Sequence, residues 1–187
     1  MSTAAVEIPG YLAGTWVIDP VHSEVSFVVR HMMVSKVRGR FDKFEGSFVT
    51  AEDPLQSTVT ASVDLTSINT GQEQRDAHIR SADFFEVEKY PTMDFTSTGV
   101  RLVDGALLLE GELTIKGTTR PVTFELEVSG FGPDAYGGTR SGFSAQTTIN
   151  RFDYGVSFNG PIPGVPGGVA VSENVTINLE IEGVLQA

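Results

Sequence analysis

NVTINLEIE, residues 174–182, is the stretch of sequence that indicates the fold most clearly. Its polar positions alternate with four apolar ones, Val175, Ile177, Leu179 and Ile181. A period of two sends successive side chains to opposite faces of an extended chain, so the four apolar side chains share one face. The stretch therefore predicts a long β-strand with one buried face and one solvated face.

The same alternation recurs along most of the chain. It is regular over residues 25–31, 59–65, 107–115 and 122–128, and less regular over 15–18, 38–50, 92–102 and 142–149. With the C-terminal stretch, these segments make nine candidate strands. Within 38–50 the period changes phase between Phe41 and Phe44, which predicts a β-bulge near Asp42 and Lys43 that keeps both rings on the buried side.

Short turns separate several of these segments. Asp104-Gly105 is a tight hairpin signal, and residues 116–118 and 133–138 supply two further connections. Strands joined in this way pair antiparallel, and a long meander either closes or leaves two exposed edges. We therefore predict an all-β fold, an extended up-and-down antiparallel barrel of about eight strands. Such a barrel either fills its interior with side chains or encloses one small ligand, and the sequence leaves both open.

Two segments depart from the strand pattern. Residues 67–91 read SINTGQEQRDAHIRSADFFEVEKYP and predict one short helical insert near residues 72–82. Ala77, Ile79 and Ala82 form only a thin apolar stripe, so this helix is expected to lie across the end or flank of the barrel. Residues 155–168, GVSFNGPIPGVPGG, are either a lid over the barrel mouth or a connection packed on the outside.

The composition limits the class of protein. A chain of 187 residues with 40% apolar composition predicts one domain, residues 14–184, after an N-terminal extension at 1–13. The formal net charge of -11, with 13 basic residues scattered among 24 acidic ones, argues against nucleic acid and against anionic lipid faces. No segment approaches the roughly 20 apolar residues of a membrane helix, so stable membrane insertion is not expected. The first residues lack a signal-peptide pattern, which predicts a cytoplasmic protein.

Short motifs follow one another in a distinctive order. They are WVID at 16–19, RHM at 30–32, SINT at 67–70, RDAHI at 75–79, DFF at 83–85, GELTIKG at 111–117 and RFDYG at 151–155. From Trp16 to about Glu182 this order resembles the YceI-like family of lipid- and polyisoprenoid-binding proteins. The resemblance implies a lipocalin-like barrel that binds an amphiphilic isoprenoid or other long-chain lipid, such as a polyisoprenoid or an isoprenoid quinone, for storage, transport or sequestration. It implies neither catalysis nor a cofactor. Founding members carry a signal peptide, so their export is not carried over to this chain.

The ligand contacts can be assigned to two groups. We expect the apolar tail to contact Phe27, Val29, Phe41, Phe95 and Leu113, and the head or rim of the ligand to contact Arg30, His31, Arg75, His78 and Tyr154. Taken singly, seven rings fit an ordinary core, because aromatic side chains dominate interiors: Phe27, Phe41, Phe44, Phe48, Phe95, Phe124 and Phe143. Three of them, Phe27, Phe41 and Phe95, are nevertheless chosen as tail contacts. An extended tail of eight prenyl units, about 38 Å long, exceeds a barrel about 25 Å tall. A long tail is therefore expected to fold back or protrude.

Other functions stay open at this point. His22, His31 and His78 do not have the spacing of a metal motif, so no metal site is predicted. One rival is a barrel enzyme that acts on a lipid or isoprenoid, with His31 or His78 as a general acid or base. A second rival is a protein-interaction module with a filled barrel. A homodimer is compatible with each of these functions.

Overall fold

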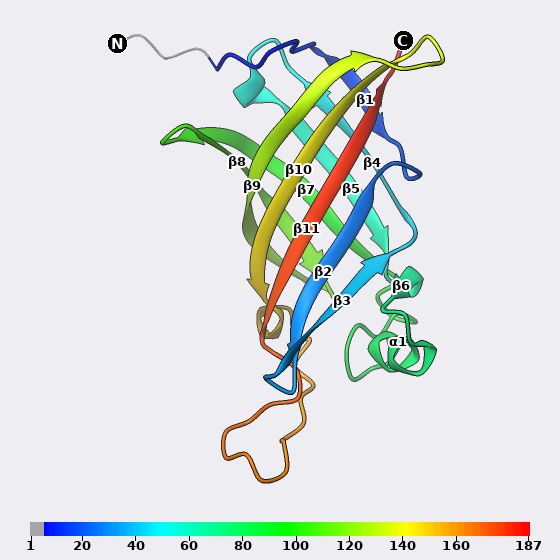
Figure 1. The fold of residues 1–187 in the computed structure, drawn as a ribbon, viewed down its shortest axis with the longest axis vertical. Coiled ribbons are helices and arrows are strands. Elements are labelled where there is room, and N and C mark those ends of the chain that lie inside the picture. Colours follow the sequence, from blue (N-terminus) through cyan, green and yellow to red (C-terminus); the bar gives the residue numbers. More distant parts are fainter. Residues whose placement is uncertain (1–5) are drawn as a thin grey trace.

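The computed structural model describes residues 6–187 and consists mainly of long antiparallel strands (Figure 1). The strands are β1 (Gly14–Ile18), β2 (Glu24–His31), β3 (Ser35–Phe41), β4 (Phe44–Thr50), β5 (Thr58–Asp64), β6 (Ile68–Asn69), β7 (Thr92–Val103), β8 (Ala106–Ile115), β9 (Thr118–Pro133), β10 (Thr139–Asn150) and β11 (Asn174–Leu185). The helices are α1 (Glu73–Arg80) and the short 3-10 turns η1 (Pro54–Gln56), η2 (Leu65–Ser67) and η3 (Arg151–Tyr154).

The sheet closes on itself as an eight-stranded barrel. The order β1-β4-β5-β7-β8-β9-β10-β11 returns to β1, where Trp16 pairs with Leu185 and Ile18 with Gly183. Farther along β11, its residues 176–180 pair with β2 instead, and β2 pairs with β3. β1 and β2 thus form one interrupted strand of the barrel wall, and β3 and β4 form a second one. The predicted up-and-down antiparallel barrel is confirmed.

The interruption between β3 and β4 falls where the phase of the sequence changes. Asp42 and Lys43 leave the strand, and their amides donate to the carbonyl and to the hydroxyl of Ser67. Phe41 is buried on one side of this break, and Phe44 packs against the same hydrophobic cluster on the other. Two residues therefore absorb the change of phase, and both rings stay inside, as predicted.

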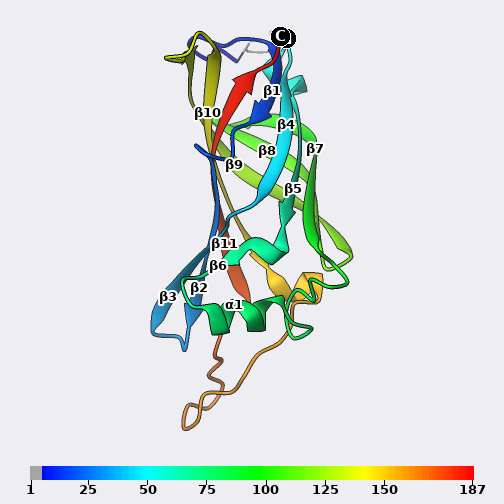
Figure 2. The same cartoon turned by 90° about the vertical axis from the view of Figure 1, so that its right-hand side faces the viewer.

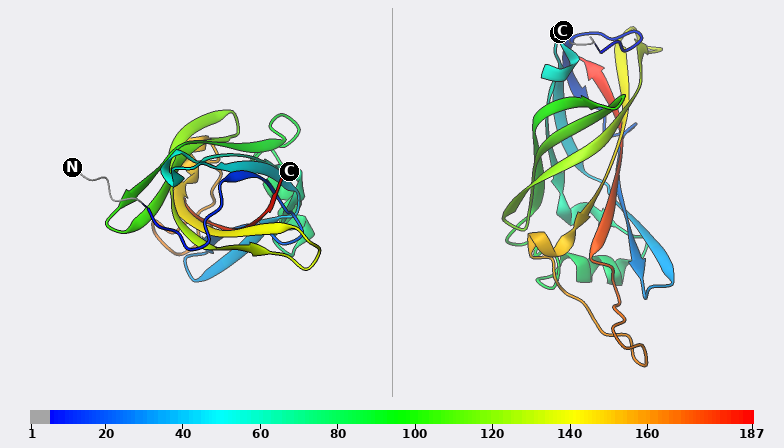
Figure 3. Two further views of the ribbon diagram at one scale, coloured as in Figure 1. Left: turned by 90° about the horizontal axis from the view of Figure 1, so that it is seen from above. Right: turned by 90° about the vertical axis from the view of Figure 1, so that its left-hand side faces the viewer.

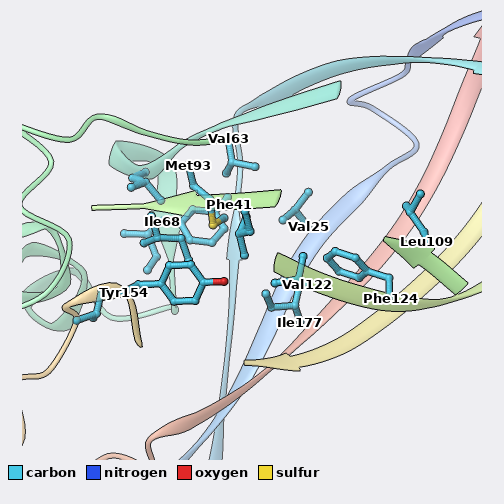
Figure 4. Close-up of a cluster of buried hydrophobic side chains, with 14 residues drawn as sticks. Val25, Phe41, Val63, Ile68, Met93, Leu109, Val122, Phe124, Tyr154 and Ile177 are labelled. Atoms are coloured by element: carbon cyan, nitrogen blue, oxygen red, sulfur yellow. The ribbon is translucent and has the colours of Figure 1, made fainter. Parts of the chain in front are cut away.

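The helix α1 lies at one end of the barrel (Figure 2). Leu65, Ile68, Phe41, Tyr154 and Val156 are buried members of the hydrophobic cluster, and we call these five residues the floor. Figure 4 shows Ile68, Phe41 and Tyr154 together, away from Leu109 and Phe124. The helix is shorter than predicted, because it begins at Glu73 and ends at Arg80.

The apolar stripe expected on this helix is partly buried only at Ile79, which packs against the core. Ala77 and Ala82 are exposed, and the buried helical residue is Asp76. Its carboxylate accepts hydrogen bonds from the Thr70 amide, at 2.9 Å, and from the Thr70 hydroxyl. Arg80 donates to the carbonyl of Thr66. These polar contacts hold the helix on the barrel, so the helix needs little apolar surface.

The opposite end carries the first described residues. Residues 6–13, which we call the N-terminal strap, cross this end of the barrel (Figure 3). The Tyr11 hydroxyl donates to the carbonyl of Ala51 at 2.6 Å. The predicted extension at 1–13 is thus in contact with the barrel over its described part, and residues 1–5 lie outside the described residues.

The loop of residues 155–172 begins at the same end of the barrel as α1 and extends outward from it (Figure 1). Its hydrogen bonds run within itself, to Arg151 at its base and to the tip of the β2–β3 hairpin, where the Met32 amide donates to the Ala170 carbonyl at 2.8 Å. The interpretation of this loop as a lid over the barrel mouth therefore does not hold in this structure. Within residues 6–187, no helix is long and apolar enough to cross a bilayer.

Candidate ligand-binding lumen

The barrel encloses an apolar lumen. The volume of this cavity is about 170 Å³. Its lining includes Ile8, Tyr11, Val25, Phe44, Phe48, Pro54, Ser57, Val63, Met93, Phe95, Val100, Leu107, Leu109, Leu113, Phe124, Phe143, Ala145 and Ile177. These side chains come from the inward phase of eight strands, from residues 54–57 and from the strap, so the alternation seen in the sequence makes the wall apolar.

Glycines help to keep this lumen open. The Phe95 ring lies against Gly111, where a Cβ atom would come within 2.4 Å of the ring. Phe27 lies against Gly39 and Phe48 against Gly183 in the same way, each with a ring atom 2.4 Å from the position of a Cβ. At Gly111 and Gly183 the absence of a side chain lets two lining rings, Phe95 and Phe48, lie along the wall instead of crossing the lumen, and Gly39 does the same for Phe27 at the floor.

The open end of the lumen is covered in part by the strap. Ile8 and Tyr11 are lining residues, and the Tyr11 ring packs edge-on against Phe131 with centroids 5.4 Å apart. The Thr50 hydroxyl accepts a hydrogen bond from the Trp16 indole at 2.8 Å and donates to the carbonyl of Leu12 at 2.7 Å. A small number of polar contacts thus holds the strap over the mouth.

The floor contains a buried cation, Arg151, which is 6% exposed. Its guanidinium donates to the carbonyls of Val156 and Phe158, both at 2.8 Å, and to that of Ser172 at 2.9 Å. Burial lowers the pKa of Arg151, and burial also raises the pKa of the Tyr154 phenol beside it in the chain. Because its bonds go to backbone carbonyls, Arg151 acts as an anchor for the base of the 155–172 loop.

Charge is distributed unevenly around the lumen. Its two charged lining residues are both acidic, Glu45 and Asp94, and both are exposed. Arg101, near the tip of the β7–β8 hairpin, pairs with Glu110 at 2.5 Å. Glu45 and Asp94 both pair with Ser62, three residues from Leu65 of the floor, so they lie away from the mouth. An anionic group at the mouth would meet Arg101, a cation that is already paired.

Arg140 is the second cation on this half of the barrel, and three carboxylates surround it. Its guanidinium lies 2.6 Å from Asp19, 3.1 Å from Asp134 and 3.4 Å from Glu182. Hydrogen bonds from His22 and Arg140 hold the pKa of Asp19 well below its usual range. The network ties the β1–β2 connection and the β9–β10 hairpin to β11.

The residues expected to contact the tail lie in three places. Phe95 and Leu113 line the lumen. Phe41 belongs to the floor, and Phe27 packs on it with ring centroids 5.7 Å apart. Val29 is half-buried on β2 and pairs with Val37. The structure thus brings two of the five to the cavity and places the other three at or below the floor.

The residues expected at the head or rim do not form one group. Tyr154 is buried in the floor, and Arg75 donates to the carbonyl of Thr70 at 2.7 Å. His78 lies 2.8 Å from Asp83 and packs between Phe84 and Phe158. Arg30 is exposed on β2, and the backbone of His31 pairs with that of Val171 in an isolated β-bridge. All five lie at the α1 end, away from the mouth that the strap covers, and their roles in binding stay predictions.

The sequence assigned several lining residues to other roles. Phe44, Phe48, Phe124 and Phe143, which were expected to be ordinary core, line the lumen. Their alternation with polar neighbours gives the correct face of each strand, but it does not distinguish a wall from a filled core. Ile8 and Tyr11 had no signal at all, because the segment that contains them shows no strand or helix period.

The fold and the cavity define the class of protein, a closed antiparallel β-barrel around an apolar lumen. The YceI-like domain matches residues 16–183, and the chain belongs to this family. A UPF0312 protein of Vibrio cholerae is 38% identical over 180 residues, which cover 92% of this chain and 88% of the relative. Protein YceI of Escherichia coli is 36% identical over 167 residues, 88% of this chain and 83% of the relative.

A solved structure shares the fold. The polyisoprenoid binding domain from Saccharophagus degradans superposes with a TM-score of 0.70 at 19% sequence identity, covering 94% of this chain and 100% of that one. At this identity the likeness concerns the barrel architecture.

Proposed function

We propose that the protein binds an amphiphilic lipid with a prenyl tail, a polyisoprenoid or an isoprenoid quinone, and holds the tail in the barrel lumen without chemical change. The observation that carries the proposal is the closed wall of apolar side chains around an open cavity. Family membership and the polyisoprenoid-binding description of the structural relative support it. Binding would serve storage, transport or sequestration of the lipid.

The energetics favour a tail inside the lumen. Each buried CH2 group contributes about 0.8 kcal/mol, so roughly ten such groups offset a typical association cost of several kcal/mol. An apolar cavity of about 150 Å³ accommodates a ring the size of benzene. The lumen of about 170 Å³ therefore fits only part of a prenyl tail as it stands. A longer tail requires the strap or the wall side chains to move.

The charges at the mouth favour a ligand with a neutral head. At the open end, Arg101 is already paired with Glu110, and Arg140 is surrounded by three carboxylates. A diphosphate placed at this end would find both of these cations already paired. The head of a quinone or an alcohol is uncharged and avoids this electrostatic cost. We therefore expect such a ligand to bind more tightly than a diphosphate with the same tail.

The two histidines considered for catalysis lie away from the lumen. His31 and His78, the candidate acid or base residues, lie at the α1 end and outside the lumen lining. A general acid or base must reach the reacting group within hydrogen-bond distance. A ligand held in the lumen would therefore not meet either histidine, which favours binding over turnover.

The test is a titration of the delipidated protein with farnesol and with farnesyl diphosphate. Trp16, the single tryptophan, stacks on the lining residue Phe48 with centroids 6.0 Å apart and serves as the fluorescent reporter. We expect saturable binding of farnesol with weaker binding of the diphosphate. Native mass spectrometry of the same mixtures gives the stoichiometry and shows whether the ligand leaves unchanged.

A matched pair of variants locates the binding. Ala145→Phe places a ring in the lumen, whereas Gln146→Phe adds the same ring on the exposed face of β10. We expect the first to weaken farnesol binding at least tenfold and the second to leave it unchanged. Equal affinity in both variants, with native thermal unfolding, would show that the ligand lies elsewhere.

A further inference from the structure

The β2–β3 hairpin carries a basic face on a strongly acidic protein. Lys36, Arg38 and Arg40 pair across the ribbon with Arg30, Val28 and Ser26, so the four cations share its outward face. All four are exposed. Arg40 pairs with Asp42, whereas among the described residues no carboxylate lies within ion-pair distance of the other three. From Val25 to Phe41 the sequence contains no acidic residue, although the chain has 24.

The tip of this hairpin is apolar and exposed. Met32, Met33 and Val34 are 41%, 56% and 83% exposed. Met32 and Met33 also have positive φ angles, 52° and 61°, in the turn closed by the Val34 amide and the His31 carbonyl. Asn and Gly are the usual residues in such turns, because bulky side chains are disfavoured there. Neither local folding nor solubility accounts for two methionines at this position.

A second apolar element lies beside the hairpin tip. The loop of residues 155–172 contains no charged residue, and Val165 and Val169 are 48% and 37% exposed. Its return arm is bound to the hairpin, because the Ser172 amide donates to the Arg30 carbonyl at 3.0 Å and the Met32 amide to the Ala170 carbonyl at 2.8 Å. Figure 1 shows both elements projecting from the same end of the barrel. Together they form one apolar tip next to a basic face.

We propose that this end of the molecule docks on an anionic lipid bilayer, with the apolar tip in the interfacial region and Arg30, Lys36 and Arg38 on lipid phosphates. Apolar side chains beside cations are the combination that binds a peripheral protein to such a surface. Charges more than about 10 Å from the bilayer are screened at moderate salt, so the net charge of -11 matters less than the charges of the docking end itself. The acidic neighbours there are Asp42, which pairs with Arg40, and Glu173, which follows Ser172 in the chain. Charge complementarity thus selects an anionic surface, and the exposed methionines and valines favour lipid over a purely polar partner.

Docking in this orientation does not load the lumen directly. The strap and the lumen mouth lie at the opposite end of the barrel (Figure 1). A docked molecule would present its mouth away from the bilayer. The proposal is therefore independent of the lipid held inside, and its test uses the delipidated full chain with vesicles alone.

The experiment is cosedimentation with phosphatidylcholine vesicles that contain or lack phosphatidylglycerol, at low and high salt. We expect binding to the anionic vesicles, weakened by salt, and none to pure phosphatidylcholine. Arg38→Glu should lower vesicle affinity at least fivefold, since each cation near an anionic surface contributes about that factor. Arg101→Glu, the same charge reversal at the other end, should change it less than twofold.

The apolar tip is tested with two valines of nearly equal exposure. Val34 is 83% and Val21 82% exposed, and only Val34 belongs to the tip. Val34→Ser should weaken vesicle binding several-fold, and Val21→Ser should not. Thermal unfolding should be unchanged in both, because neither side chain is buried. Absence of binding to anionic vesicles would overturn the proposal, as would equal effects of the paired variants. Self-association that Val34→Ser abolishes, without vesicle binding, would assign this face to a second copy of the chain instead.

Discussion

At the scale of single residues, the lumen depends on positions that lack a side chain. Phe95 can lie along the wall because Gly111 leaves the space beneath its ring empty. The same arrangement of a ring over a glycine occurs at Gly39 and at Gly183. Two of these rings, Phe95 and Phe48, line the lumen, so its open volume depends on Gly111 and Gly183 as well as on the apolar lining residues.

Gly111→Ala is expected to push the Phe95 ring into the lumen, because the new Cβ would come within 2.4 Å of it. Crowding of this kind costs about 1–3 kcal/mol of stability. We expect a lower free energy of unfolding and at least fivefold weaker farnesol binding, measured by urea unfolding and Trp16 fluorescence. Gly99→Ala on β7 is the control, since its Cβ would contact nothing within 4 Å. Farnesol binding of wild-type strength in Gly111→Ala would show that the ring does not limit the lumen.

At the scale of elements, the strap takes the role that the sequence suggested for the loop at 155–168. Two strap residues line the open end of the lumen, whereas the loop projects from the other end. Val156 of that loop is buried in the core and Phe158 packs against His78, whereas Val165 and Val169 are exposed. A lid over the mouth, if the lumen is loaded from this end, must therefore involve residues 6–13.

Tyr11→Ala removes the hydrogen bond to Ala51 and the edge-on contact with Phe131. The strap should then open more often, so we expect farnesol to dissociate several-fold faster in stopped-flow displacement. Tyr136→Ala, at a side chain that is 92% exposed on the β9–β10 hairpin, is the control. Replacing Ile162 and Val165 with Ser should leave the rate unchanged. An unaltered rate in Tyr11→Ala would mean that the strap does not control exchange.

The Arg140 network predicts how stability depends on pH. The folded-state pKa of Asp19 lies below its ordinary value of 3.8, chiefly through hydrogen bonds from His22 and Arg140. A depressed carboxyl pKa stabilises the folded state above the unfolded value, and this contribution is lost as pH falls through the folded pKa. Stability should therefore be fully present above about pH 4 and should decline below it.

Arg140→Met should make this acid-induced loss of stability smaller, because the pKa of Asp19 then lies closer to its unfolded value. Urea unfolding at neutral pH and at about pH 3 measures the difference. Arg101→Met is the control, since Arg101 forms an exposed pair that contributes little. An identical pH dependence in Arg140→Met and the wild type would contradict the assignment.

At the scale of the whole molecule, the barrel was predictable because its information is local. Alternation along each segment gives strand and face, and short turns such as Asp104-Gly105 give the pairing of neighbours. The end of α1 and the split of 38–50 into β3 and β4 differ from the prediction by a few residues. The cytoplasmic location and the domain limits at 14 and 184 stay predictions.

The candidate site was predictable only in part. Phe95 and Leu113 line the lumen as expected, whereas Phe27, Val29 and Phe41 share their inward phase but lie at the floor. The period of a strand specifies a face and carries no information on height along the barrel axis. The head-group residues came from motifs, and these motifs gather at the α1 end, where Asp76, Arg75 and Arg151 make structural hydrogen bonds.

The sequence by itself determined an all-β chain with one short helix, an apolar face on every long strand and membership of the YceI-like family. These properties follow from the order of residues over short distances and need no knowledge of the closed barrel. Only the tertiary structure decided that the interior is hollow, which end is open, and that cations and apolar residues of two distant segments form one tip. Those features depend on how rings lie over glycines and on which ends of long strands meet, and both are set by contacts between residues far apart in the chain.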